Sequence, residues 1–156
     1  MTIFEWAARN GVSQAAVAEL LTAVLEPGQS FGKPGPESSE SAVQANLQLE
    51  AARRGGSLWR NNSGACVDQD GRQVRYGLAN TSAKINGVFK SSDLIGVTPR
   101  QIGGEIVGVF TAVEVKRPGW RGPVSQHEKA QAAFHAKVRA MGGIGLFAQS
   151  VRDVFK

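Results

Sequence analysis

Three residues with the chemistry of a hydrolytic metal site lie at the ends of two apolar segments. Asp93 opens the segment DLIGV, and Glu114 and Lys116 close the segment IVGVFTAVEVK. Side chains two positions apart on a strand leave it on the same face, so Glu114 and Lys116 would lie side by side. If the two segments are neighbouring strands, Asp93 comes beside Glu114. Two converging carboxylates form the hard-oxygen site that Mg²⁺ or Mn²⁺ prefers.

Such a trio is suited to phosphodiester hydrolysis. The metal would polarise the phosphate and make a bound water more acidic, while Lys116 would orient or deprotonate that water and offset developing charge. A simpler alternative stays open for each residue: Asp93 can cap a turn, and Glu114 and Lys116 can form an ion pair at a strand end. The bare pattern is degenerate, but ionised groups ending an apolar strand are costly unless they are paired or hold a metal.

Two more polar residues lie on helical stripes that should face the sheet. Glu40 begins a helix expected from Ser39 to Arg54 and shares its stripe with Val43, Leu47 and Ala51. Gln131 lies in a helix expected from Val124 to Met141, on a stripe with Phe134, His135, Val138 and Met141. A buried amide needs partners, which a site carboxylate, a metal-bound water or a phosphate would supply. Alternatively, Glu40 favours the helix dipole and Gln131 bonds nearby backbone.

The elements that must position these residues alternate between helix and strand. Apolar side chains occur on both faces of Ile106–Lys116, which indicates a central strand covered by helices on each side. We therefore expect an α/β fold around one mixed sheet. The other expected elements are a strand at Leu58–Val67, a hairpin and loop over 68–91, a strand at Asp93–Val97, a last strand at Ile144–Ala148 and a short polar tail.

The N-terminal segment is expected to form a separate helical hairpin over residues 1–26. Thr2 and Glu5 have capping-box spacing, Gly11 separates two helices, and Ser13 caps the second. The second helix has no Lys or Arg, so packing or dimerisation is favoured over a DNA-reading helix-turn-helix. Residues 27–38 are rich in Gly, Pro and Ser and predict a linker to a domain over 39–156.

The composition limits the classes of partner and of protein to which this chain could belong. Among 156 residues, 18 are Lys or Arg and 13 are Asp or Glu, a net charge of +5 that favours a polyanion. The single cysteine, Cys66, excludes an internal disulfide framework and a cysteine-rich zinc site. The sequence has no run of 18 apolar residues, and Glu5 and Arg9 argue against a signal peptide or membrane span. We expect a cytoplasmic protein of a bacterial or phage-infected cell.

Several motifs, taken in order from about Glu40 to Val151, resemble one known family. They are the helix with Glu40 and Gln44, then LWRNNSGA, YGLAN, KSSDLIGV, VEVKRPG, a helical glutamine and MGGIG. This arrangement is similar to the virus-type replication-repair nuclease (VRR-NUC) family of the PD-(D/E)XK nuclease superfamily, especially its stand-alone phage modules. One departure is Ser92, which stands where the superfamily has a proline before the aspartate.

The resemblance implies a restriction-endonuclease-like αβββαβ core and a role for each site residue. Asp93 and Glu114 would bind Mg²⁺ or Mn²⁺, Val115 would add its backbone carbonyl, and Lys116 would be the catalytic lysine. Glu40 would bond a metal-bound water or a second metal. Gln131 would be the helical polar residue near the site, with Gln126 as the alternative.

Residues that would hold the substrate flank this centre. Arg60 and Asn61 offer donors to phosphate oxygens, and Lys90 precedes Asp93. The segment after the catalytic lysine combines cations with an aromatic ring on a loop expected to be flexible, which could clamp backbone or stack on an unpaired base; its residues are Arg117, Trp120 and Arg121. Trp59 is expected in the core, and the remaining cations on the surface.

The sequence thus predicts a divalent-metal-dependent DNA endonuclease. The resemblance suggests structure-selective cutting of branched DNA in repair, by a homodimer similar to Holliday-junction resolvases, because a four-way junction needs two paired cuts. Two alternatives remain open. One is the same chemistry on flaps, DNA ends or RNA, and the other is a non-catalytic nucleic-acid-binding module.

Overall fold

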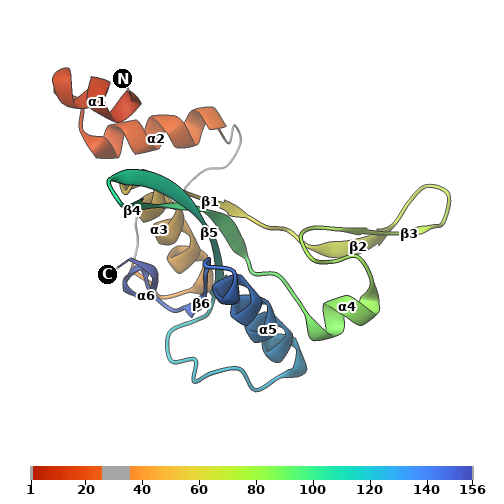
Figure 1. The fold of residues 1–156 in the computed structure, drawn as a ribbon. Helices are drawn as coiled ribbons and strands as arrows, with labels where there is room; N and C mark the ends of the chain where they lie inside the picture. Colours follow the sequence, from red (N-terminus) through yellow and green to blue (C-terminus); the bar gives the residue numbers. More distant parts are fainter. Residues whose placement is uncertain (1, 26–35, 156) are drawn as a thin grey trace.

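The computed structural model describes residues 2–25 and 36–155, with the side chains of 21–25 left out. Most of the predicted linker over 27–38 therefore lies outside the described residues. Figure 1 shows the chain. Its elements are α1 (Ile3–Arg9), α2 (Gln14–Leu25), α3 (Glu40–Arg53), β1 (Ser57–Arg60), β2 (Gly64–Val67), β3 (Gln73–Tyr76), α4 (Ala83–Val88), β4 (Leu94–Ile102), β5 (Glu105–Val115), α5 (Gln126–Ala140), β6 (Ile144–Ala148) and α6 (Val151–Val154).

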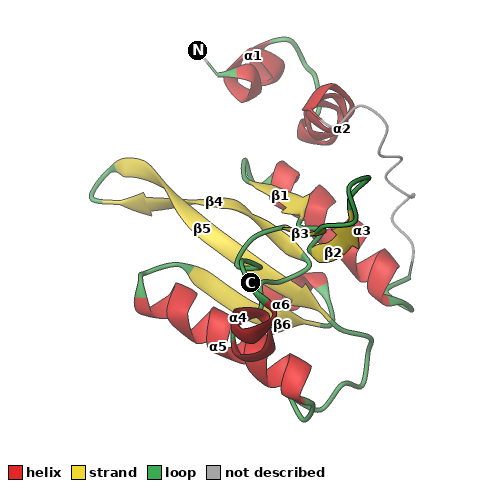
Figure 2. Cartoon of the chain, turned by 90° about the vertical axis from the view of Figure 1, so that its right-hand side faces the viewer, coloured by secondary structure: helices red, strands yellow, loops and turns green. Residues whose placement is uncertain are grey.

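A four-stranded mixed sheet in the order β1-β4-β5-β6 forms the centre of the fold. The pairs β1–β4 and β4–β5 are antiparallel, and β6 runs parallel to β5 after the α5 crossover. Helices α3 and α5 lie on opposite faces of the sheet, and α6 packs beside α3 and β6 (Figure 2). The predicted α/β fold with a mixed sheet flanked by helices is confirmed.

The alternation of side chains along β5 divides the core into two parts. Val113 and Val115 face α3 in a cluster that also contains Leu47 and Leu94. Ala112 faces α5 in a smaller cluster whose other buried members are Phe134 and Val138. Glu114 and Lys116 share the parity of Ala112, so the end of β5 presents them on the α5 side of the sheet.

The segment predicted as one strand over Leu58–Val67 is two strands in different sheets, so that prediction was wrong. β1 ends at Arg60, and β2 pairs with β3 in a two-stranded sheet of its own, the β2–β3 arm, which projects from the body of the molecule (Figure 1). The polar run Asn61–Ser63 between them carries the chain from one sheet to the other. Helix α4 was not predicted, and the expected polar tail instead forms α6 and buries Phe155.

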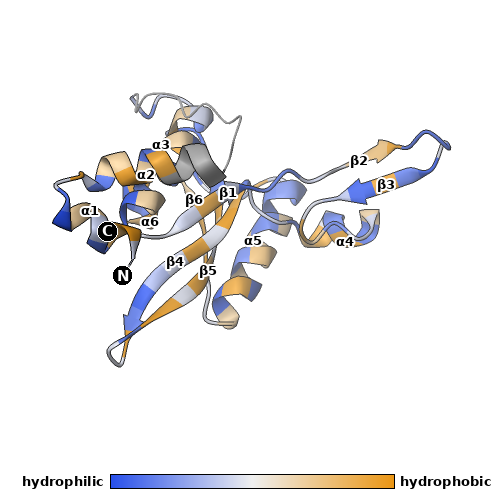
Figure 3. Cartoon of the chain, turned by 90° about the horizontal axis from the view of Figure 1, so that it is seen from above, coloured by the Kyte–Doolittle hydropathy of each residue, from blue (hydrophilic) through white to orange (hydrophobic). Residues whose placement is uncertain are grey.

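Strand β4 is longer than predicted, whereas β5 has the predicted length shifted by one residue, and only part of β5 is covered by helices. Its residues 111–115 are buried, whereas its first half extends with β4 past β1 and β6 and has apolar side chains in solvent. Figure 3 shows β4 and β5 projecting together, with hydrophobic colour along β5. The prediction of helices on both faces therefore holds only for the end that carries Glu114. The exposed side chains include Ile102 (63%), Ile106 (77%) and Phe110 (40%).

The N-terminal hairpin forms as predicted. Thr2 and Glu5 make the capping box, and Ser13 Oγ accepts from the backbone N–H of Ala16 at the start of α2. α2 packs on α3, with Val17 and Ala18 buried. Its proposed part in dimerisation stays a prediction. In the described part of the chain, the helices are too short or too polar to cross a bilayer.

Candidate active site

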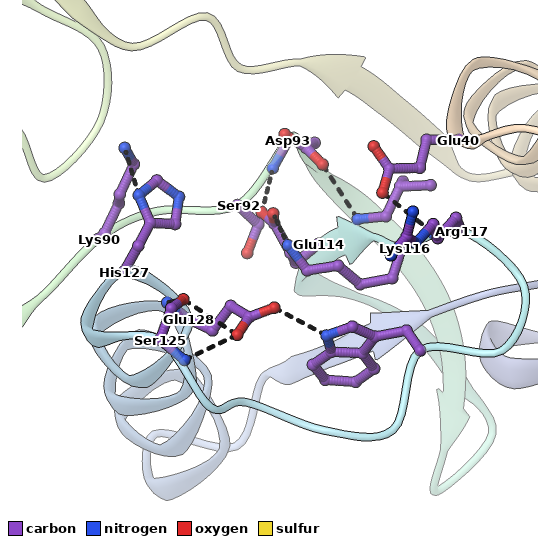
Figure 4. A network of polar contacts seen from close by, with 12 residues as sticks. Glu40, Lys90, Ser92, Asp93, Glu114, Lys116, Arg117, Ser125, His127 and Glu128 are labelled. Carbon is purple, nitrogen blue, oxygen red and sulfur yellow. Dashed lines mark hydrogen bonds and ion pairs between the residues drawn. The ribbon is translucent and has the colours of Figure 1, made fainter.

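The pairing of β4 with β5 places Asp93 opposite Glu114. Leu94 pairs with Val113, so the residue before Leu94 meets the residue after Val113. Two hydrogen bonds fix this contact: the Asp93 backbone N–H donates to Glu114 Oε2 (3.2 Å), and the Val115 N–H donates to Asp93 Oδ2 (3.1 Å). The structure therefore brings together the two carboxylates that the sequence singled out, at the covered end of the sheet (Figure 4).

Lys116 joins this pair through Glu114. Its Nζ lies 2.8 Å from Glu114 Oε1, and Glu114 is only 4% exposed. Burial raises the pKa of Glu114, and the negative charge of Asp93 raises it further, against hydrogen bonds from Lys116 and Gln131. Asp93 is more open to solvent, yet burial of its carboxylate among protein atoms also raises its pKa. Lys116 pairs with Glu114 and acts on Asp93 only through its charge, so two carboxylates share one nearby lysine.

Gln131 lies under these carboxylates, at the inner face of α5. It is 2% exposed, and its side chain makes a hydrogen bond to Glu114. Its Oε1 is buried without a donor among the described residues. The alternative glutamine, Gln126, is exposed and bonds the backbone carbonyl of Gly87 instead. Of the two candidates, Gln131 is therefore the one in the site.

Glu40 reaches the same end of β5 from the other face of the sheet. Ser39 caps α3 and leaves Glu40 in its first turn, where Glu40 Oε1 accepts from the backbone N–H of Arg117 at 3.0 Å. Its charge is close enough to Asp93 to raise the pKa of that residue. In Figure 4 Glu40 lies beside Lys116 and across from Asp93. All five predicted centre residues thus lie at one end of the sheet.

Behind Asp93, a buried hydrogen bond joins two residues to which the sequence had given no such role. Ser92 Oγ lies 2.7 Å from His135 Nε2, and both side chains are buried. The His135 ring packs edge-on against Phe147, with centroids 4.7 Å apart. Burial lowers the pKa of His135 to about 4, so the ring is neutral at pH 7. Ser92, which directly precedes Asp93, is thus held from α5.

A polar pocket of about 550 Å³ opens beside the carboxylates. One wall comes from the segment before β4 and the first turns of α5, where Lys90 Nζ lies 3.4 Å from His127 Nδ1. Tyr76, at the base of the β2–β3 arm, lies on its lining as well. His127 and Tyr76 were missed by the sequence reasoning. His127 did have a signal, since residues 127, 131 and 135 are spaced four apart on one helical stripe.

Four of the predicted substrate-binding residues are accessible to a ligand. Arg60, Arg117 and Arg121 are exposed to solvent, and Lys90 lines the pocket. Asn61 lines the pocket and also has a structural role, because its Nδ2 donates to Ser91 Oγ and to the Ser92 carbonyl (2.8 and 2.9 Å); its predicted contact with phosphate stays a prediction. Its backbone N–H also donates to the Asp93 carbonyl, so Asn61 positions the strand that carries Asp93.

Trp120 also differs from its prediction. Its indole N–H donates to Glu128 Oε1 (2.8 Å), and its ring packs against Phe147 with centroids 4.6 Å apart. Glu128 in turn caps α5 with Ser125, and these bonds hold its pKa at about 2. The loop after Lys116 is therefore tied down rather than free, and the Trp120 ring is occupied. Trp59, expected in the core, is 41% exposed.

The donor set bears on the predicted metal. In residues 2–25 and 36–155, no group of three or more His, Cys, Asp or Glu side chains is placed to hold a metal ion. Asp93 and Glu114 offer two neighbouring carboxylates, and the buried Gln131 Oε1 can accept from a water. Mg²⁺ keeps several of its waters and is often held by only one or two carboxylates. The residues therefore fit a hydrated Mg²⁺ or Mn²⁺ better than a metal enclosed by protein ligands.

Comparison with protein-family models, with curated proteins and with solved structures finds no match. The functional argument for this chain accordingly depends on the geometry of its own residues.

Proposed function

We propose that this chain is a divalent-metal-dependent nuclease that hydrolyses phosphodiester bonds at Asp93, Glu114 and Lys116. One observation carries the proposal: two neighbouring acidic residues and a lysine converge at the covered end of β5, beside an open polar pocket. A purely structural ion pair would need one acid for one base, whereas Lys116 here pairs with Glu114 and a second acid with a raised pKa, Asp93, lies beside them. A bound cation would balance the negative charge of Asp93.

In this proposal each residue has a defined task. Asp93, Glu114 and the Val115 carbonyl would hold Mg²⁺ or Mn²⁺, which supplies polarisation of the phosphate and a more acidic water. Lys116 would orient the attacking water and take up its proton or offset the developing charge. Gln131 would fix Glu114 and accept from a water, and Glu40 would bond a metal-bound water or a second metal.

The order of elements supports membership in the PD-(D/E)XK superfamily. Taken without α4 and the β2–β3 arm, the sequence α3, β1, β4, β5, α5, β6 matches the expected αβββαβ core. The arm and α4 then form an insertion between the first two strands of that core. Asp93 precedes the second core strand, and Glu114 and Lys116 end the third, as in the VRR-NUC resemblance.

For the substrate we propose DNA, preferably branched, cut by a homodimer. The net charge of +5 supports a polyanion, and the resemblance supports junctions. The test uses Lys116→Ala and, as a matched control, Lys137→Ala, an exposed lysine of α5. Both are assayed with and without Mg²⁺ or Mn²⁺ on a four-way junction, a flap, a DNA end, a duplex and RNA. We expect Lys116→Ala to lose cutting and the control to keep it; equal cutting of junction and duplex would refute branch selectivity.

A second candidate function, a non-catalytic nucleic-acid-binding module, is favoured by the short Lys116–Glu114 ion pair, which satisfies both groups without a metal. This candidate predicts that Lys116→Ala changes only stability and DNA affinity, with no metal-dependent cutting by the wild type on any substrate. Cutting that requires Mg²⁺ and disappears in Lys116→Ala decides against it.

A further inference from the structure

Lys90 and His127 form a pair on the pocket wall that the proposed chemistry does not use. Lys90 lies three residues before Asp93, and His127 lies in the first turn of α5. Their side chains meet at 3.4 Å, and both line the pocket that contains Asp93 and Glu114 (Figure 4). In the described ranges Lys90 has no carboxylate within ion-pair distance. Its charge is therefore available to the pocket.

The chemistry of the pair follows from the contact between them. An ammonium group has only N–H donors, so His127 Nδ1 accepts and the proton of the neutral ring is on Nε2. Burial, and then the charges of Lys90 and Lys116, lower the pKa of His127. The pair accordingly presents one positive charge and donors from both side chains. Such a set suits a phosphodiester monoanion, and a neutral imidazole suits hydrogen bonding rather than proton donation.

The segment that carries Lys90 is fixed against the helix that carries His127. The Lys90 N–H donates to the Ala130 carbonyl of α5 (3.1 Å), and Phe89 packs edge-on against Phe134 with centroids 5.2 Å apart. The segment before β4 and the start of α5 therefore behave as one wall. Pre-positioned donors lose less entropy when they bind a ligand, which distinguishes this pair from flexible surface cations.

An independent observation indicates that the pocket is built for an occupant. Gln131 lies on the same stripe of α5 as His127, and its buried Oε1 has no donor in the described parts of the chain. Buried amide oxygens are normally satisfied, so this atom requires a donor from the pocket, such as a water held beside the bound strand. A phosphate on Lys90 and His127 would bring the attached sugar and its waters into that space.

We propose that Lys90 and His127 form a second phosphate subsite, which binds the phosphodiester next to the one cut at Asp93 and Glu114. The subsite rests on the proposed nuclease function and deepens it, because it fixes the register of the strand in the active site. Lys90 supplies the charge, and His127 supplies a directional hydrogen bond.

Binding is tested apart from cutting. DNA affinity is measured without metal in the Asp93→Asn background, alone and with Lys90→Ala, His127→Asn or the control Lys137→Ala. We expect Lys90→Ala to weaken binding about tenfold and to reduce the slope of log K against log salt by about 0.9, the value for one duplex phosphate contact. His127→Asn should weaken binding without changing the slope, because the ring is neutral. Effects equal to those of the control would overturn the subsite.

Cutting then locates the phosphate. Each linkage flanking the scissile one is replaced singly by an uncharged methylphosphonate. At one position we expect wild-type kcat/KM to fall about tenfold and Lys90→Ala to show no further loss, since the interaction is already absent. Additive losses at every position would overturn the subsite while leaving the nuclease intact. If the wild type cuts no substrate although the binding effects are present, the result would instead count against the proposed function.

Discussion

The two halves of β5 differ in burial although both are rich in apolar residues. At the covered end, Leu94 and Val113 are fully buried on the face of the sheet that α3 covers, and Glu114 is buried in a hydrogen bond with the Asp93 backbone and an ion pair with Lys116. At the projecting end, Ile106 and Phe110 are exposed. This difference shows that the helices covering the strand, rather than the hydropathy of the strand itself, determine where a carboxylate has a raised pKa. Asp93 and Glu114 have raised pKa values because they lie where the helices close over the sheet.

The largest expected effect on the free energy of unfolding comes from the packing of the core at the covered end. Leu94→Ala should reduce the free energy of unfolding by about 2–5 kcal/mol, because it leaves a cavity in the main core. Chemical denaturation followed by tryptophan fluorescence measures the change. A loss below about 1 kcal/mol would contradict the burial of Leu94 and the distinction drawn between the two ends.

The next largest expected effect is the pH dependence of stability that comes from His135, a buried residue of α5 at the covered end. Its pKa is about 4 in the folded protein against 6.5 for an ordinary histidine. The unfolded chain therefore binds the proton more tightly, so stability is full above about pH 6.5 and is lost as the pH falls towards 4. The loss amounts to about 3 kcal/mol.

His135→Phe keeps an aromatic ring and removes the titration. Unfolding free energies measured between pH 7 and pH 4 should fall less steeply in this variant than in the wild type. His127→Asn is the control for the other histidine with a lowered pKa. Identical pH profiles for His135→Phe and the wild type would count against a buried, neutral His135.

A smaller effect is expected where the two ends meet. Thr98 Oγ1 and Thr111 Oγ1 lie 2.7 Å apart, both buried, and Thr111 also donates to the Val109 carbonyl. Thr111→Val should cost about 1 kcal/mol, since one buried hydroxyl loses its partner. The double change Thr98→Val with Thr111→Val should cost less than the sum of the single changes. Strict additivity in this double-mutant cycle would show that the two hydroxyls do not interact.

The smallest effect is expected at the projecting end. Ile106→Thr should change the free energy of unfolding by no more than about 0.5 kcal/mol, because the side chain is exposed and threonine also suits a strand. A loss above about 1 kcal/mol that grows with protein concentration would show that a second chain covers this end.

Much of the covered end could be predicted from the sequence. The sequence indicates a short strand at Asp93 and a long strand that ends in Glu114 and Lys116. Pairing of these two consecutive strands is enough to bring Asp93 beside Glu114. The apolar stripes of two helices then predict that Glu40 and Gln131 face the sheet. The β2–β3 arm could not be predicted, because each of its strands is only four residues long and mostly exposed, so no buried face leaves an alternating pattern in the sequence. The bond between Ser92 and His135 joins residues 43 positions apart, and no local pattern reveals such a contact. For the same reason nothing indicated that Trp120 would be held by Glu128.

The central claim is tested most directly by Asp93→Asn, which keeps the size of the side chain and an oxygen that can accept from Val115. Metal-dependent cutting of branched DNA and DNA affinity are measured together for the wild type and this variant. The account predicts that the cutting rate falls by roughly a thousandfold or more while DNA affinity stays within about threefold and the fold is kept. A variant that still cuts at the wild-type rate, or a wild type that cuts equally well without a divalent metal, would contradict it.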